Sequence, residues 1–186
     1  MSKAEILTRS SIDPEAFFNS RSSVRQFSEE IVSDVVLTRA VQLAAKTPSV
    51  CNRQSGRAYC STDPATIKKA LSFQNGNRGF GHTVPAIFVV CSEFDIFEKL
   101  DERNQGWIDG GLFAMTLVYA LHSLGLGSCM LNWSVPNARD ASFRAAFGVP
   151  ENQGVICMIA VGHLRDSFRV AQSPRRPVED FKHPLI

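Results

Sequence analysis

The stretch RSSVR groups side chains that are suited to binding an anion. It places Arg21 and Arg25 four residues apart, with Ser22 and Ser23 between them. Arginine offers planar hydrogen-bond donors that match a phosphate group, and serine hydroxyls add further donors. On its own, the segment fits a solvated charge pair beside a helix better than an anion site. The pattern therefore indicates half of a phosphate site only if other donors join it.

A second arginine-rich segment, SPRRP, lies near the C-terminal end of the sequence. It holds Arg175 and Arg176 between two prolines. Prolines restrict the backbone, so the two guanidinium groups can point at a fixed anion. The alternative is a mobile basic tail, which would bind nothing in particular.

The stretch TPSVCNRQSG combines the predicted end of a helix with a loop rich in small polar residues. It contains Pro48, Ser49, Asn52 and Gln54. Side-chain amides donate and accept hydrogen bonds at once, which suits a heteroaromatic ring with ring nitrogens and carbonyls. A simple polar turn explains the same composition.

The chain has no recognisable set of catalytic side chains. The four histidines are scattered without metal-ligand spacing. The G-x-S-x-G pattern of a serine nucleophile is absent, and no G-x-G-x-x-G follows a predicted strand. A site that holds a phosphate and a ring without its own acid, base or nucleophile suits a cofactor that carries the chemistry itself.

Composition narrows the class of protein. The chain has 186 residues, of which 44% are hydrophobic, so we expect one domain over residues 1–186. The formal net charge of +2 gives no whole-molecule attraction to nucleic acid or to an anionic membrane. The beginning of the sequence lacks the apolar core of a signal peptide. Five cysteines without a C-x-x-C pair indicate reduced thiols, so we expect a cytoplasmic protein.

Hydrophobic periodicity and capping residues predict the elements that position these segments. Asp-Pro and serine caps favour helix starts at Asp13, Ser33 and Asp63. The pattern also favours a short helix over residues 94–103, a long apolar helix over 106–124 and an amphipathic helix over 135–150. Strands are expected at 57–61, 86–91, 128–133 and 154–164. Because helices and strands do not alternate regularly, the fold class is α+β.

Four segments in this order resemble the nitroreductase family of FMN-dependent oxidoreductases. They are RSSVRQF, then PSVCNRQ after one helix, then the long helix ending in GLGSC, and finally SPRRPVED. Each motif is weak alone, but the four in order extend from about Phe17 to Asp180. The resemblance implies a central, mainly antiparallel sheet flanked by helices. It also implies an intertwined homodimer with FMN at the interface, in which the long helix packs across the two-fold axis.

The resemblance also implies roles for particular residues. The phosphate and ribityl side of FMN would be held by Arg21, Ser22, Ser23, Arg25, Arg175 and Arg176. The isoalloxazine ring would be lined by Pro48, Ser49, Asn52 and Gln54, from the partner subunit. The segment Leu131, Asn132, Trp133 would approach the pyrimidine edge and N5 of the flavin.

The implied activity is transfer of hydride from NADH or NADPH through flavin N5 to an electron-poor acceptor. A nitroaromatic, quinone or enone would follow the donor into the same place, in a ping-pong mechanism. Two departures from the family pattern leave an alternative open. Ser55-Gly56 replaces the common Pro-Trp, and Trp133 stands where a small residue is common. The alternative is a non-catalytic flavin- or nucleotide-binding protein of the same fold. Outside the family, the arginines alone could serve an anion-binding interaction protein.

Overall fold

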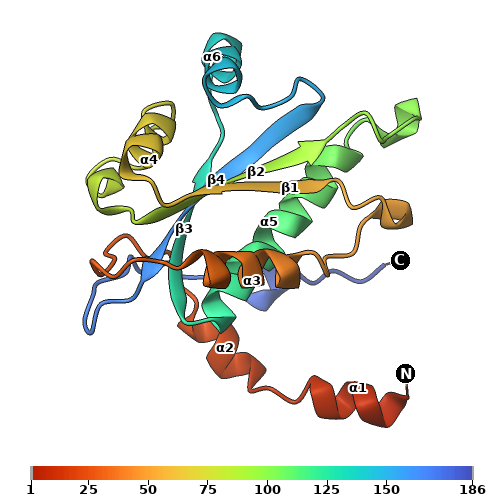
Figure 1. Cartoon of the computed structure of the whole chain (residues 1–186). Helices are drawn as coiled ribbons and strands as arrows, with labels where there is room; N and C mark the ends of the chain where they lie inside the picture. The colour runs from red at the N-terminus through yellow and green to blue at the C-terminus, as the bar shows by residue number, and fades with distance from the viewer. Residues whose placement is uncertain (1, 186) are drawn as a thin grey trace.

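The computed structural model describes residues 2–185 and is built on one four-stranded antiparallel sheet (Figure 1). The strand order is β1 (Gly56–Ser61), β2 (Ala86–Glu93), β4 (Gln153–His163) and β3 (Leu126–Asn132). The two central strands, β2 and β4, are buried along nearly their whole length. The prediction of a buried strand from the continuous apolar run is therefore confirmed, and so is the α+β class.

Helices cover both faces of the sheet, which is why the central strands are apolar on every side. On one face lie α4 (Pro64–Leu71) and α6 (Asn137–Phe147), and on the other α3 (Asp34–Ala44) and α5 (Gln105–Ser123) (Figure 1). Alternation along β2 sends Ile87 and Val89 into the core beneath α4 and α6, whereas Phe88 and Val90 enter the core against α3 and α5.

The helix starts follow the capping residues in the sequence. The side chains of Asp13, Ser33 and Asp63 each accept a hydrogen bond from a backbone N–H in the first turn of α2 (Pro14–Ser20), α3 and α4. An additional helix, α1 (Lys3–Arg9), begins at a capping box in which Ser2 and Glu5 bond reciprocally, and it lies away from the body of the molecule (Figure 1).

The predicted helix over residues 94–103 is wrong. The segment forms turns with a single 3-10 turn at Leu100–Glu102. The ring of Phe94 packs on Trp107, with ring centroids 4.8 Å apart, and lies where a Cβ at Gly106 or Gly154 would have to be. Packing of this half-buried ring against two glycines and Trp107 overrides the local helical pattern, because tertiary contacts outweigh weak helix propensity.

The long helix α5 has one buried and one exposed apolar side. Ala114, Leu117 and Leu121 are fully buried against the sheet. On the outer side, Trp107 and Ile108 are each 52% exposed and Leu112 is 47% exposed. Among the described residues, no helix combines the length and the hydropathy needed to span a bilayer.

Candidate functional site

The RSSVR segment is fixed against the edge strand β3. The backbone N–H of Val24 donates to the carbonyl of Ser128 at 2.9 Å, and Ser23 and Ser128 form a parallel bridge. A few residues later, the N–H of Ser28 donates to the carbonyl of His163 at 3.0 Å. Val24 is buried, so the arginines on either side of it stand on an anchored backbone.

The chain returns to the same place after β4. The guanidinium Nε of Arg165 donates to the carbonyl of Phe27 at 2.6 Å, and the N–H of Arg169 donates to Oε1 of Gln26 at 3.1 Å. These bonds bring the C-terminal segment alongside the N-terminal one. A cavity of about 320 Å³ is lined from both segments, including Arg21, Ser22, Ser23, Arg25, Ser173 and Arg175. Arg176 lines none of the cavities described here.

A second cavity, of about 500 Å³, adjoins this basic pocket. It shares Arg21, Ser23 and Arg175 with the first and continues along β3 at Ser128 and Met130. Its far wall comes from α5, through Met115, Val118 and Tyr119. The combined space has cations at one end and apolar walls at the other, an arrangement that suits a phosphate joined to a flat apolar group.

The end of β3 presents Asn132 to solvent and points Leu131 into the core. Leu131 is 3% exposed, so only its backbone is available to a ligand. By strand alternation, Asn132 lies on the same side of β3 as Met130. Gln74, which is 5% exposed, donates from Nε2 to the carbonyl of Asn132 at 3.0 Å and accepts from the N–H of Gly76 at 2.5 Å. Sequence reasoning missed Gln74, because no local pattern connects it with β3.

The side chain of Trp133 is turned towards α6. Its indole N–H donates to Oδ1 of Asp140 at 2.7 Å, and its ring packs on Phe143 with centroids 4.8 Å apart. Burial raises the pKa of Asp140. Hydrogen bonds from Arg144 and Trp133, together with the charge of Arg144, outweigh burial, so the pKa of Asp140 lies below its ordinary value. The indole thus belongs to the packing beneath α6, and only the backbone of Trp133 is free for a ligand.

The amide-rich loop has an unusual backbone conformation. Cys51, Asn52 and Gln54 have φ angles of 49°, 54° and 54°, which lie in the left-handed region. Three such residues close together store strain that the surroundings must offset, and strain of this kind clusters at ligand sites. The backbone N–H of Gln54 donates to the hydroxyl of Ser49 at 2.9 Å. These contacts hold the loop in one shape.

Asp109 of α5 supports the loop from beneath. Its carboxylate is 3% exposed and accepts from the N–H of Val50 at 3.2 Å and from Nε2 of Gln105 at 2.8 Å. An acidic residue inside an apolar helix was a visible signal in the sequence, which our sequence reasoning did not use. Without Asp109 the loop would lose the hydrogen bond that joins Val50 to the side chain of an α5 residue.

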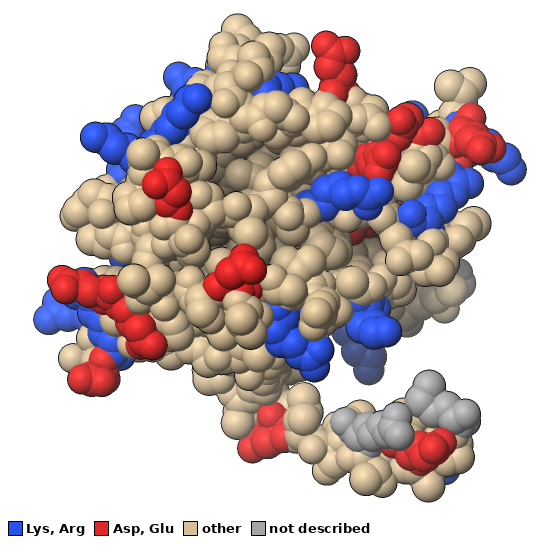
Figure 2. Space-filling view, viewed as in Figure 1, with Lys and Arg blue, Asp and Glu red and all other residues tan. Residues whose placement is uncertain are grey.

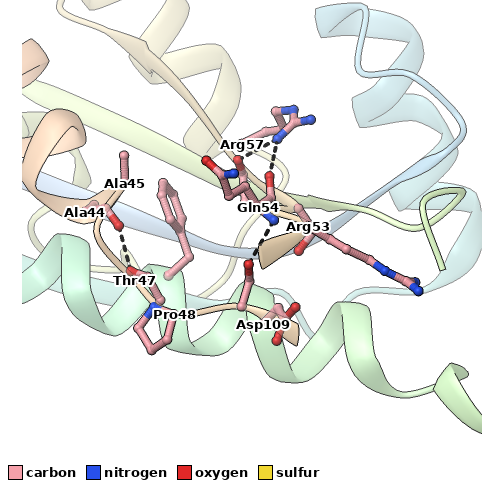
Figure 3. Close-up of a pocket in the computed structure, with 12 residues that line it drawn as sticks. Ala44, Ala45, Thr47, Pro48, Arg53, Gln54, Arg57 and Asp109 are labelled. Carbon is pink, nitrogen blue, oxygen red and sulfur yellow. Dashed lines mark hydrogen bonds between the residues drawn. The ribbon is translucent and has the colours of Figure 1, made fainter. Parts of the chain in front are cut away.

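A pocket of about 390 Å³ lies between this loop and α5 (Figure 3). Pro48, Ser49 and Gln54 line it, together with Arg53, Arg57, Asp109 and Phe113. Asn52 lies on the exposed side of the loop and does not line the pocket. Arg57 donates to the carbonyl of Gln54 at 2.8 Å and forms an ion pair with Glu93. Its side chain therefore joins the loop to the end of β2.

The Ser55-Gly56 departure has a packing explanation. Ser55 is fully buried, and its hydroxyl accepts from that of Ser92 at 3.0 Å. A Cβ at Gly56 would collide with the ring of Phe113. Phe113 packs against Gly56 and forms one wall of the pocket.

Within one chain, the predicted site residues form two separate groups. The arginine cavities reach α5 at Met115–Tyr119, whereas the loop pocket reaches it at Asp109 and Phe113. No cavity contains both Arg21 and Gln54. Whether the loop serves the cofactor of a partner subunit therefore stays a prediction.

Two observations concern metal ligands and buried thiols among residues 2–185. No cluster of three His, Cys, Asp or Glu side chains there could hold a metal ion. Burial raises the pKa of Cys91 and of Cys157 to about 12, so both thiols stay protonated near neutral pH.

The family assignment follows from comparison with known proteins. The model of the nitroreductase family matches residues 67–163, which is more than half of the chain. The chain therefore belongs to the nitroreductase family, and the resemblance seen in its motifs is confirmed.

Two named relatives and one solved structure are similar to this chain over most of their length. A protein of Archaeoglobus fulgidus named as an NADH dehydrogenase/NAD(P)H nitroreductase is 26% identical over 151 residues, which cover 78% of this chain and 82% of the relative. An FMN reductase [NAD(P)H] of Bacillus subtilis is 23% identical over 176 residues, covering 87% and 69%. A Desulfovibrio desulfuricans protein described as a nitroreductase, in complex with FMN, superposes with a TM-score of 0.78 at 19% identity, covering 94% and 99%. At that identity the superposition shows the fold.

Proposed function

We propose that this protein is an FMN-dependent oxidoreductase that accepts hydride from NADH or NADPH and delivers it to an electron-poor acceptor. The observation that carries the proposal is the pairing of the basic pocket at Arg21, Arg25 and Arg175 with the apolar cavity along β3. The names of the relatives, an NAD(P)H nitroreductase and an FMN reductase, support the same cofactor and donor. Nitroaromatics, quinones and enones are the acceptor classes to test.

The residues present fit FMN. Guanidinium groups and the hydroxyls of Ser22 and Ser23 would hold the phosphate, and the apolar walls at Met115 and Met130 would face the ring. Bound FMN would supply N5, the atom that accepts and returns hydride. Because the cofactor supplies that chemistry, the chain needs no nucleophile of its own.

The role of the protein is to bind, orient and shield. Gln74 fixes Asn132, whose backbone and amide can donate to the pyrimidine edge of the ring and so favour negative charge there. A single binding place for donor and acceptor would impose ping-pong kinetics. We further propose a single domain over residues 1–186 and a cytoplasmic location.

The proposed assembly is a homodimer with its two sites at the interface. The exposed apolar side of α5, at Trp107, Ile108 and Leu112, is the surface we assign to the two-fold contact. Across that contact, the loop bearing Ser49 and Gln54 would reach the arginine-lined cavity of the partner subunit. Within one chain, the pocket that this loop lines includes none of the arginines of the basic pocket.

The direct test is cofactor uptake followed by anaerobic reduction. The purified protein should bind FMN, show flavin absorbance and lose that absorbance when NADH or NADPH is added. Failure to bind added FMN would overturn the proposal. A protein that stays yellow with both donors would instead be the non-catalytic flavin binder.

Paired arginine variants test the phosphate assignment. Arg21→Ala and Arg175→Ala should each raise the Kd for FMN about tenfold or more, because a hydrogen bond to a charged group contributes about 1.5–3 kcal/mol. Arg176→Ala is the matched control, since Arg176 lines neither cavity. Equal effects of Arg175→Ala and Arg176→Ala would show that only the general charge of the tail matters.

A further inference from the structure

A groove on the opposite side of the sheet is not used by the proposed site. It lies between α4 and the loop that follows it, has a volume of about 520 Å³, and we call it the α4 groove. The buried side chains of Ile67, Leu71 and Val84 form its floor. The charged groups on its rim are those of Lys68, Arg78 and His82.

The α4 groove has basic side chains and no acidic side chain to neutralise them. No aspartate or glutamate lines it, and among residues 2–185 neither Lys68 nor Arg78 forms an ion pair. Basic side chains gather at the upper left of Figure 2, where Figure 1 places α4. The next lysine, Lys69, is engaged elsewhere, because its Nζ donates to the carbonyl of Ala146 at 3.2 Å. The net charge of only +2 shows that this accumulation is local.

The outer wall of the groove is held in one shape. Nδ2 of Asn77 donates to the carbonyls of Leu71 at 2.6 Å and Gln74 at 3.1 Å, while its own carbonyl accepts from the N–H of Gly81 at 2.8 Å. A preformed wall favours binding, because less free energy is lost in ordering the loop when the ligand binds.

The same loop links the groove to the proposed cofactor site. Gln74 contacts Asn132 at the end of β3, and Asn77 lines the groove three residues later. Three residues of chain span at most about 11 Å. A ligand of dinucleotide size is therefore long enough to reach both places.

We propose that the α4 groove binds the adenosine 2′-phosphate end of NADPH, a proposal that rests on the proposed function. The apolar floor at Ile67, Leu71 and Val84 takes the adenine ring, and Lys68 and Arg78 take the phosphate. NADH lacks that phosphate, so the groove discriminates between the two donors. Preference for NADPH then originates on α4 and its loop, away from the flavin.

The first experiment measures binding of adenosine 2′-phosphate to the whole protein by isothermal titration calorimetry, alongside inorganic phosphate. We expect adenosine 2′-phosphate to bind, and Lys68→Gln and Arg78→Gln each to raise its Kd about five- to tenfold. Arg139→Gln is the control, because it removes one exposed cation from α6, outside the groove. If inorganic phosphate binds as tightly as adenosine 2′-phosphate, or if the control weakens binding equally, the assignment is overturned.

The second experiment compares the two donors in steady-state kinetics. Arg78→Gln should raise the KM for NADPH about five- to tenfold and leave the KM for NADH and both kcat values unchanged. Equal changes for NADPH and NADH would refute the groove as the source of discrimination. Binding of adenosine 2′-phosphate to a protein that takes up no FMN would overturn the proposed function but support the groove as a nucleotide phosphate site.

Discussion

Replacement of Trp133 by phenylalanine separates a packing role from a cofactor role. In the wild-type protein the ring centroids of Trp133 and Phe143 are 4.8 Å apart. The variant keeps an aromatic ring against Phe143 and removes the indole N–H. The lost bond is the 2.7 Å contact with Oδ1 of Asp140. Asp140 keeps its bond from Nε of Arg144 at 2.5 Å.

The expected loss of stability follows from these contacts. A hydrogen bond to a charged group contributes about 1.5–3 kcal/mol. The side chain of Asp140 is 27% exposed and can turn partly to water, so the lower end applies. A loss of about 1.5–2 kcal/mol in a chain of this size lowers Tm by about 3–8 °C.

Differential scanning calorimetry and FMN titration provide the two readouts. We expect Trp133→Phe to lower Tm by this amount while the Kd for FMN changes less than twofold. Trp107→Phe is the matched control, because the phenylalanine ring can still pack on Phe94 and remain on the apolar outer side of α5, so Tm should change little. A large loss of FMN affinity at unchanged Tm would refute the reasoning and place the indole against the cofactor.

The same network predicts a dependence on pH. The bonds from Arg144 and Trp133 hold the pKa of Asp140 below its ordinary value, although burial opposes them. Their stabilisation is therefore present above the ordinary carboxyl pKa and is lost as the pH falls through the lowered pKa. The Tm difference between wild type and Trp133→Phe should shrink in acid. A constant difference between pH 7 and pH 3 would contradict the ionised acceptor.

Two further variants and one labelling experiment test the proposed site. Gln74→Leu removes the donor to the carbonyl of Asn132 at 3.0 Å, so FMN affinity should fall several-fold in a fluorescence titration; an unchanged Kd would mean that Asn132 is not positioned by this bond. Iodoacetamide should label the exposed Cys51 and Cys60 of the native protein, and FMN should slow labelling of Cys51 alone by mass spectrometry; equal protection of both would exclude a specific loop contact. Met115→Glu should weaken both the dimer and FMN binding in light scattering and absorbance measurements, whereas a flavin-loaded monomer would disprove the shared interface.

Much of the fold was predictable because its signals are local. Asp13, Ser33 and Asp63 cap helices in the structure as their sequence context predicted. The helix expected over residues 94–103 failed because the ring of Phe94 packs on Trp107 and against Gly154, and Gly154 lies far outside the window of a local pattern. The capping box at Ser2 shows that a usable local signal can also be overlooked.

The site was predictable in composition but not in arrangement. The motifs identified Arg21 and Arg175, and the structure places them in one cavity. Three features required tertiary contacts: the support of the loop by Asp109, the tie between Gln74 and Asn132, and the orientation of Trp133. Each depends on residues that are distant in sequence or on the face to which a side chain turns.

The sequence by itself determined the family, most of the helices and strands, and the residue types available for binding a phosphate. These follow from short-range rules: capping, hydrophobic periodicity and motif spacing act within a few residues of one another. Only the tertiary structure decided that the two arginine segments share a cavity, that the amide loop lies apart from it within one chain, and that a basic groove forms beside α4. The physical reason is that side chains from distant segments meet only after the sheet and its helices have packed, since burial of apolar surface sets their positions.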